Sequence, residues 1–196
     1  MDKKEIQAKR KREYFIEAAK EIVREEGVSD LTVKKVADKA GYAQGTLYNY
    51  FDSLNDLLFY CIIDFFTECK EFVLKRDQES VAPAVRVINL ARTYSEYFLQ
   101  NPNVYRLAFL TDLGSPPEEI AKSREYRPEI VKILRASLDD CVGAGLIKPE
   151  EKKNIRNLIG NCIHGNLLFF INDKIELTAE KVLEQIEKDI NYLLAD

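Results

Sequence analysis

Apolar residues recur at helical spacing along almost the whole chain, and no segment alternates apolar and polar residues as a strand would. Residues 3–26 are the clearest case, because apolar side chains line one face and Gly27 follows where a helix commonly ends. These side chains are Ile6, Phe15, Ala18, Ala19, Ile22 and Val23. There is also no internal repeat and no low-complexity segment. The pattern predicts an all-α fold.

Capping residues and helix breakers divide the rest of the chain into further helices. Thr32 can cap a short helix that Gly41 ends, and Ser53 and Thr178 can cap two longer ones. Residues 114–117 form the clearest break. The expected helices span residues 33–39, 44–51, 54–75, 80–99, a segment that starts at Pro102, a segment after Pro128 that ends near 144, 149–172, and a last helix that ends near 194.

The composition excludes several classes of protein. The chain has 196 residues, 46% of them hydrophobic and 32% charged, which is typical of one globular domain or two small ones. It has no apolar run of about 18 residues and no apolar segment behind its basic N-terminus, so we expect no membrane span and no secretory signal. The four cysteines are far apart and lack a Cys-x-x-Cys pair, which favours buried thiols in a reducing cytoplasm over a disulfide or metal site. They are Cys61, Cys69, Cys141 and Cys162.

Charge is unevenly distributed. The net charge is −4, but residues 1–12 carry six Lys or Arg against two Asp or Glu. A basic end on an acidic chain is consistent with one local anionic partner, and a solvated terminus with no partner is the alternative.

The stretch Gly41–Phe51, GYAQGTLYNYF, combines large aromatic residues with small polar ones and has no charge. A helix here would place Leu47, Tyr50 and Phe51 on one face and polar side chains mostly on the other. Two short helices joined by a glycine-containing turn, behind a longer helix, form a helix-turn-helix. Its polar face can enter a DNA major groove, although a helical hairpin with a solvated polar face remains the alternative.

Residues 10–58 resemble the N-terminal domain of the TetR family of bacterial repressors. The resemblance rests on Ala18-Ala19, Ile22, Leu31-Thr32-Val33, Val36-Ala37, Ala40-Gly41, the run Gly45-Thr46-Leu47-Tyr48-Asn49-Tyr50-Phe51, and Leu57-Leu58. It implies an all-α homodimer with an N-terminal three-helix helix-turn-helix DNA-binding domain, expected at 1–52. It also implies a larger C-terminal helical domain for ligand binding and dimerisation, expected at 53–196.

The resemblance also implies DNA-binding roles. It makes an N-terminal arm and two short helices the contacts to double-stranded operator DNA, through Lys9, Arg10, Arg12, Thr32, Lys35, Gln44, Gly45, Thr46, Tyr48 and Asn49. Three positions depart from the family pattern. Ala43 stands where Ser or Thr is common, Asn49 where His is common, and Leu54 where Lys is usual. Because the first and last departures remove phosphate contacts, we expect the basic arm to matter more here.

Two C-terminal segments are candidates for a dimer interface. The second half of 149–172 is apolar nearly all round, and the last helix carries an apolar stripe. Two such helices from each of two subunits can form a four-helix bundle, whereas burial within one subunit is the alternative. The family resemblance favours the dimer, with Ile159, Ile163, Leu167, Phe170, Val182, Ile186 and Ile190 at the interface.

Aromatic residues are frequent in 54–148 and suggest a pocket for an apolar or aromatic inducer. The candidate lining residues are Phe66, Tyr94, Phe98, Tyr105, Phe109 and His164, although any one aromatic residue is more often part of a core. The predicted function is a ligand-responsive repressor without a cofactor or metal. An enzyme is disfavoured, because a single histidine and the lack of a glycine-rich phosphate loop or metal-ligand spacing leave no catalytic set. A helical protein-binding module is a third class.

Overall fold

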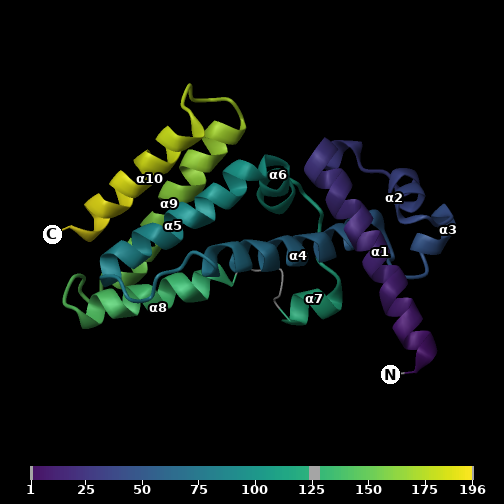
Figure 1. The fold of residues 1–196 in the computed structure, drawn as a ribbon, viewed down its shortest axis with the longest axis horizontal. Coiled ribbons are helices and arrows are strands. Elements are labelled where there is room, and N and C mark those ends of the chain that lie inside the picture. The colour runs from purple at the N-terminus through teal and green to yellow at the C-terminus, as the bar shows by residue number, and fades with distance from the viewer. Residues whose placement is uncertain (1, 124–128, 196) are drawn as a thin grey trace. The chain divides into compact units, whose positions relative to one another are not determined.

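The structure, a computed structural model, describes residues 2–123 and 129–195. Over these residues it contains helices and connections and no strand (Figure 1). The predicted all-α fold is therefore confirmed.

The first helix, α1 (Lys3–Glu26), has the bounds that the sequence predicts. Its N-terminus has a capping box, in which the Asp2 carboxylate accepts from the Lys4 backbone N–H and the Glu5 carboxylate accepts from the Asp2 N–H. Gly27 has φ of 90° and ends the helix, while Asn103 donates to the Arg24 carbonyl at 3.1 Å. The basic N-terminal segment is thus helical rather than an extended arm.

A short 3₁₀ turn, η1 (Val28–Asp30), leads to the two short helices α2 (Val33–Ala40) and α3 (Gln44–Leu47). Thr32 caps α2, its hydroxyl accepting from the Lys35 N–H at 3.2 Å, and Gly41 ends it in the left-handed conformation. The helix α3 is shorter than predicted. The Asn49 and Tyr50 N–H groups bond three residues back, to the carbonyls of Thr46 and Leu47, so the chain tightens into turns before Phe51.

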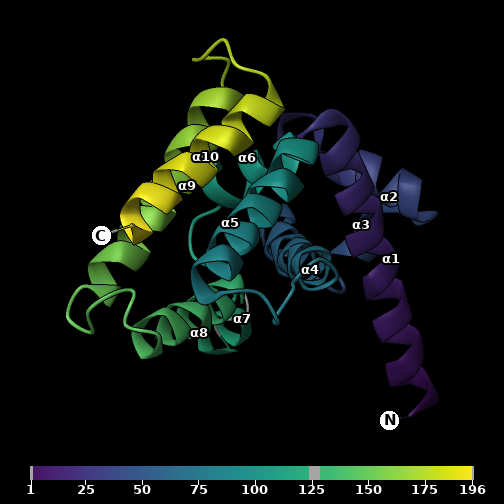
Figure 2. The same cartoon turned by 60° about the vertical axis from the view of Figure 1, so that its left-hand side comes forward.

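Apart from α7, for which no helix was predicted, the later helices follow the predicted order (Figures 1 and 2). They are α4 (Leu54–Leu74), α5 (Pro83–Gln100), α6 (Pro102–Leu110), α7 (Glu118–Ser123), α8 (Ile130–Gly143), α9 (Lys152–Ile171) and α10 (Ala179–Leu194). Two begin three residues later than expected. Pro83 starts α5, since proline suits the first helical turn, and a turn precedes α9. The expected break at Pro128 lies outside the described residues.

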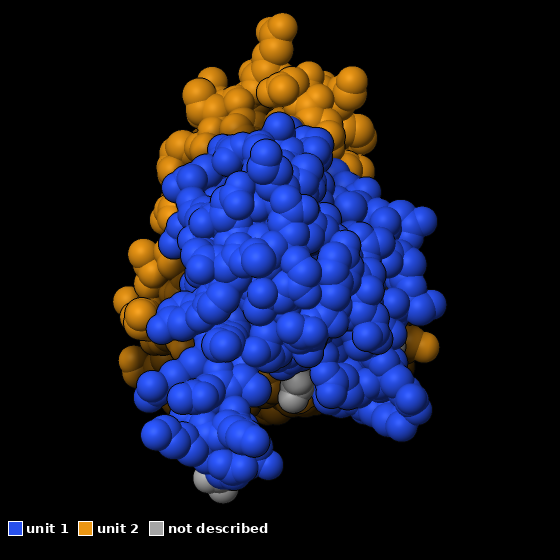
Figure 3. Space-filling view, turned by 90° about the vertical axis from the view of Figure 1, so that its right-hand side faces the viewer, with its two compact units in different colours: residues 1–66, 101–127 blue, residues 67–100, 128–196 orange. Residues whose placement is uncertain are grey.

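The chain forms two compact units, residues 1–66 with 101–127 and residues 67–100 with 128–196 (Figure 3). In the first unit, α6 packs against α1, and the buried Lys20 ammonium pairs with Asp64 on α4 at 3.3 Å. In the second unit, Arg92 of α5 pairs with Glu180 and Glu187 of α10 at 2.8 and 2.7 Å. The domain boundary at 52/53 is a different division and stays a prediction.

In the second unit, α5, α8, α9 and α10 pack around a shared apolar core. Its fully buried side chains include Phe98, Leu138, Ile159 and Ile186, one from each helix. Across the described parts of the chain, no helix is long and apolar enough to span a membrane.

Candidate nucleic-acid interface

The segment that carries the predicted DNA contacts has one buried face and one exposed face. Leu47 and Phe51 are buried, and Tyr50 is half-buried. Thr46 is half-buried, whereas the other candidate contacts of this segment are exposed: Gln44, Gly45, Tyr48 and Asn49. Ala43 provides no side-chain cap for α3. The polar groups are therefore accessible to a partner while the aliphatic and aromatic side chains hold the segment in place.

Aromatic contacts with α1 position the turn and the end of α3. The Phe15 ring lies 5.3 Å from the Tyr42 ring and 6.1 Å from the Tyr50 ring, measured between centroids. The Lys11 ammonium lies 5.8 Å from the centre of the Tyr42 ring. These contacts explain why a segment with an exposed polar face also contains so many aromatic residues.

Gly45 has no internal reason to be glycine. Its φ is not positive, and a Cβ atom added there would meet no atom within 4 Å. Glycine in a helix costs about 0.5–1 kcal/mol relative to alanine, because it restricts the unfolded chain least. A glycine that packing and backbone conformation do not require is consistent with close approach of an external partner.

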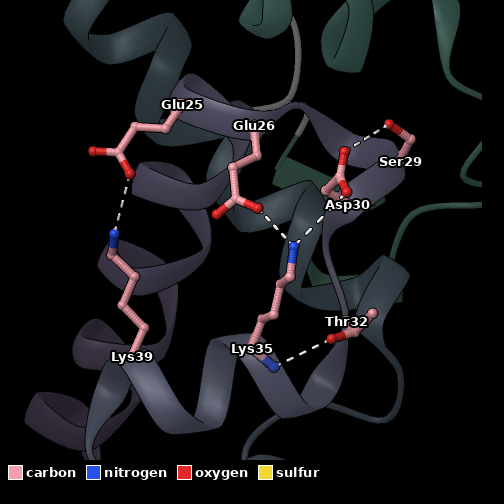
Figure 4. Close-up of polar contacts among 7 residues, drawn as sticks. All are labelled: Glu25, Glu26, Ser29, Asp30, Thr32, Lys35 and Lys39. Atoms are coloured by element: carbon pink, nitrogen blue, oxygen red, sulfur yellow. Dashed lines mark hydrogen bonds and ion pairs between the residues drawn. The ribbon is translucent and has the colours of Figure 1, made fainter.

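Lys35, a predicted phosphate contact, is already paired with carboxylates (Figure 4). Its Nζ atom lies 2.6 Å from Glu26 Oε2 and 3.8 Å from Asp30 Oδ1, and the hydrogen bond to Glu26 raises the pKa of Lys35. Both members of the closer pair remain substantially exposed to solvent. Lys35 is therefore a cation at neutral pH whose charge is matched by neighbouring carboxylates.

Two other lysines of α2 contrast with each other. Lys39 Nζ lies 2.9 Å from Glu21 Oε2 and 3.4 Å from Glu25 Oε2, and the hydrogen bond to Glu21 raises its pKa. Lys34 is exposed and has no partner within the described residues. Lys34 is not among the DNA contacts that the family resemblance implies. The local sequence does not show that Lys34 and Lys35 differ, because the carboxylates that pair with Lys35 come from α1 and η1.

The three arm residues differ in their surroundings. Arg10 is exposed, and Lys9 is exposed with its Nζ 3.9 Å from Glu13. The Arg12 guanidinium lies 3.8 Å from the Tyr60 ring centre and 5.4 Å from that of Phe51, and it contacts Glu119 of α7 at 3.4 Å. Arg12 thus contacts α4 and α7 within its own unit, while Lys9 and Arg10 remain accessible.

Comparisons with known proteins support this arrangement. The family model for bacterial regulatory proteins of the tetR family matches residues 15–61, which contain α2 and α3. The fatty acid metabolism regulator protein of Bacillus subtilis (strain 168) is 31% identical over 146 residues, which cover 72% of this chain and 71% of that protein. The chain belongs to the TetR family of bacterial transcriptional regulators.

Solved structures share the fold of this TetR-family chain over almost its whole length. A candidate fatty acid metabolism regulator from Clostridium perfringens has a TM-score of 0.68 and 18% identity, covering 93% of this chain and 99% of its own. A TetR transcriptional regulator from Rhodococcus sp. RHA1 has a TM-score of 0.64 and 21% identity, with coverages of 96% and 98%. At these identities the likeness concerns the fold alone.

Three of the six candidate ligand residues of this TetR-family chain belong to the first unit and three to the second. In the first unit, the Phe109 ring lies 5.8 Å from Phe66 and 5.0 Å from Tyr105. In the second unit, the Tyr94 ring lies 5.0 Å from Phe98 and 6.0 Å from His164, and burial lowers the pKa of His164. Phe109 and His164 are half-buried, and the other four are buried. Their role as a ligand pocket stays a prediction.

An open hollow of about 160 Å³ lies in the first unit, between α4, α6 and the segment after α6. It is lined by Phe59, Ile62, Leu107, Ala108, Thr111, Asp112, Leu113 and Gly114. None of the six candidate ligand residues lines it. Within the described residues, no three His, Cys, Asp or Glu side chains are grouped closely enough to hold a metal ion.

Most of the residues expected at the dimer interface are buried within the single chain. Ile159, Ile163, Leu167, Val182, Ile186 and Ile190 are at most 5% exposed, and Phe170 is half-buried. A different face of α9 exposes Leu158, Leu168 and Phe169, by 45%, 39% and 53%. The continuous apolar pattern of α9 thus divides into a buried stripe and an exposed apolar face.

Proposed function

We propose that the protein is a ligand-responsive repressor that binds a palindromic operator as a homodimer and leaves it when a small apolar or aromatic molecule binds its C-terminal part. The observation that carries this proposal is the exposed polar face of α3 over a buried apolar face, in a chain of the TetR family. A regulator of this kind works in the cytoplasm, where the DNA is.

In this proposal, α2, α3 and the turns directly after α3 contact the DNA through side chains with different roles. Gln44 and Asn49 contact base edges, since an amide both donates and accepts hydrogen bonds. Thr46 and Tyr48 contact phosphates through their hydroxyl groups, and Gly45 allows close approach of the backbone. Thr32 lies at the start of α2 and is a further candidate for a phosphate contact, whereas Lys35 at the same end is already paired with Glu26 and Asp30.

The basic residues near the N-terminus add contacts that do not depend on sequence. Lys9 and Arg10 are exposed on α1 and are available to DNA phosphates. Arg12 is also predicted to contact DNA as part of the N-terminal arm, but its guanidinium contacts the Tyr60 ring and Glu119. A deletion of residues 1–10 therefore tests the arm more cleanly than one that also removes Arg12.

The exposed apolar face of α9 supports a homodimer. Leu158 and Phe169 are separated by eleven residues, or about three turns, so they lie on the same side of the helix. An exposed apolar face of this kind commonly marks an interface. We place this face, with Leu158, Leu168 and Phe169, at the contact between two copies, while the buried stripe supports the fold of each copy.

The ligand is proposed from composition and from one relative. The candidate ligand residues are aromatic apart from His164, which favours an apolar or aromatic molecule with one or two polar groups. The Bacillus subtilis relative is named as a regulator of fatty acid metabolism, and we propose genes of that metabolism as targets here. A ligand that displaces α4 would also displace α3, because α4 begins shortly after α3 ends. The two recognition helices of the dimer would then lose the spacing of about 34–36 Å that successive major grooves require.

The test begins with selection of bound fragments from genomic DNA, followed by paired substitutions. Gln44→Ala should weaken operator binding by about 1–3 kcal/mol and relax the preference at one base position in each half-site. Tyr48→Ala should weaken binding to operator and random DNA alike, because a phosphate contact carries no sequence information. An equal effect of Gln44→Ala on both DNAs would count against the proposed base contact.

The ligand response has its own test. By linkage, a ligand that lowers the affinity for operator must bind more weakly to the operator complex, by the same factor. Candidate apolar compounds are titrated into the protein with and without operator. Equal ligand affinity in the two titrations would refute a role as inducer.

A further inference from the structure

Four carboxylates, those of Glu21, Glu25, Glu26 and Asp30, face two lysines of α2, and we call them the α2 carboxylate clamp (Figure 4 shows three of the four). Glu26 and Asp30 approach Lys35, while Glu21 and Glu25 approach Lys39. Each of these two lysines is therefore matched by two negative charges from α1 or η1. Lys34, on the same helix, has no such partner within the described residues.

This arrangement has a direct consequence for binding to a polyanion. A lysine contributes to DNA affinity when it neutralises a phosphate and releases the counterion bound there. A lysine that already pairs with a carboxylate must exchange one anionic partner for another. The carboxylate that it leaves behind then lies near the phosphates and repels them.

The ion pairs of the clamp contribute little to the stability of the folded chain. The side chains of Lys35 and Glu26 are 43% and 44% exposed, and those of Lys39 and Glu21 are 32% and 56% exposed. Ion pairs this exposed contribute little to folding, because water and salt screen them. Their larger effect is on the net charge that the short helix presents to an anionic partner.

We propose that the α2 carboxylate clamp withholds Lys35 and Lys39 from DNA phosphates and so lowers the affinity of the protein for DNA of any sequence. The inference rests on the proposed DNA-binding function. Sequence recognition then depends on α3. Glu26 and Asp30 are positioning residues in this scheme, since they act through Lys35.

The test measures what Lys35 contributes to DNA binding with the clamp present and absent. Operator and random DNA are titrated between 50 and 200 mM salt with the wild type, Lys35→Gln, Glu26→Gln/Asp30→Asn, and the triple variant. Asp38→Asn, with and without Lys35→Gln, is the matched control. Asp38 is an exposed acid of α2 without a partner in the described residues, so its loss changes the charge but frees no lysine. Thermal unfolding of each variant verifies that it is folded.

With the clamp present, Lys35→Gln should leave the salt dependence unchanged. Glu26→Gln/Asp30→Asn should steepen the slope of log affinity against log salt by about 0.9 for each subunit that gains a phosphate contact. The ratio of its DNA affinity to that of the wild type should then grow by about 3- to 4-fold per subunit as the salt concentration falls from 200 to 50 mM. Adding Lys35→Gln should abolish this gain, whereas it should have no effect in the Asp38→Asn background.

Three outcomes would overturn the proposal. If Lys35→Gln alone flattens the slope of the wild type, Lys35 already reaches a phosphate and the clamp does not withhold it. If the charge-removing variants raise affinity only in proportion to the charge that they remove, two for Glu26→Gln/Asp30→Asn and one for Asp38→Asn, and Lys35→Gln has no effect in either background, only net charge matters. If the wild type binds no DNA, both the proposed function and the role of the clamp are refuted. The first two outcomes, in contrast, refute only the role of the clamp.

Discussion

At the scale of single residues, neighbours in the sequence have different surroundings. Lys34 is solvated while Lys35 lies between two carboxylates, and Gly45 is open to solvent beside the fully buried Leu47. These differences separate residues that support the fold from residues that are available to a partner. Substitutions at the accessible positions should weaken binding without a loss of stability, and substitutions at the buried positions should lower stability.

Gly45→Ala should leave the fold intact and weaken DNA binding. An added methyl group meets no atom within 4 Å, and the loss of glycine's flexibility should raise the free energy of unfolding by up to about 1 kcal/mol. The same methyl group should obstruct close approach of the DNA backbone. Chemical denaturation and operator titration measure the two effects. A loss of stability together with unchanged operator affinity would contradict the role assigned to Gly45.

His164 is the only histidine of the chain, so a change in the free energy of unfolding at about pH 6.5 can be assigned to it. Burial lowers its pKa below the unfolded value of about 6.5, so the unfolded chain binds this proton more readily. The free energy of unfolding should therefore be highest above pH of about 7 and fall as the pH drops through about 6.5, until folded His164 is protonated too. Urea unfolding between pH 7.5 and 5.5 checks this. His164→Gln should remove this part of the pH dependence, and identical curves for both proteins would contradict the assignment.

At the scale of elements, the short helix α7 is held by groups from two other helices. The buried Ile120 belongs to it, and its Glu119 carboxylate accepts from the Tyr60 hydroxyl of α4 and lies 3.4 Å from the Arg12 guanidinium of α1. Burial and the hydrogen bond to Glu119 raise the pKa of Tyr60 to about 12, so this hydroxyl remains a donor at neutral pH. Arg12 therefore has a structural role beside or instead of a contact with DNA.

Arg12→Gln should loosen α7 without unfolding α1. The substitution removes the guanidinium that contacts both the Tyr60 ring and Glu119. Amide hydrogen exchange over residues 118–123 should become faster, since local opening of a short helix then costs less free energy. Arg10→Gln is the matched control, because Arg10 is exposed two positions earlier on the same helix. Equal exchange in the two variants would show that Arg12 does not hold α7.

At the scale of the whole molecule, α9 faces two environments. Its buried stripe packs inside the second unit, and its exposed apolar face is the proposed contact with a second copy. The proposed interface thus differs from the set expected from sequence, because most of those residues are already buried within the single chain. The two faces should respond differently to an introduced charge.

Phe169→Arg should yield a folded monomer, whereas Ile163→Arg should destabilise the subunit itself. Phe169 is 53% exposed in the single chain, so a charge there is solvated unless a second copy covers it. Ile163 is 5% exposed, and an unpaired charge at a buried site costs on the order of several kcal/mol. Light scattering gives the mass, and thermal unfolding gives the stability. A wild type that is monomeric at micromolar concentration would rule out the dimer.

The sequence by itself determined the fold class and, apart from α7, the order of the helices and most of their bounds. These features depend on local signals, such as helical periodicity, the cap at Thr32, the left-handed Gly41 and Pro102 at the start of α6. The opposed buried and exposed faces of α3 also followed from spacing alone. The end of α3 was placed too late, because periodicity cannot distinguish a helix from a run of tight turns.

Only the tertiary structure decided which groups meet. The partners of Lys35 lie five and nine residues earlier, on η1 and α1, and Arg12 meets Glu119 more than a hundred positions away. The aromatic residues expected in one pocket lie in two units, and the apolar residues of α9 divide between an inner and an outer face. A periodic pattern shows that a face is apolar but not what covers it, because the covering surface comes from distant parts of the chain.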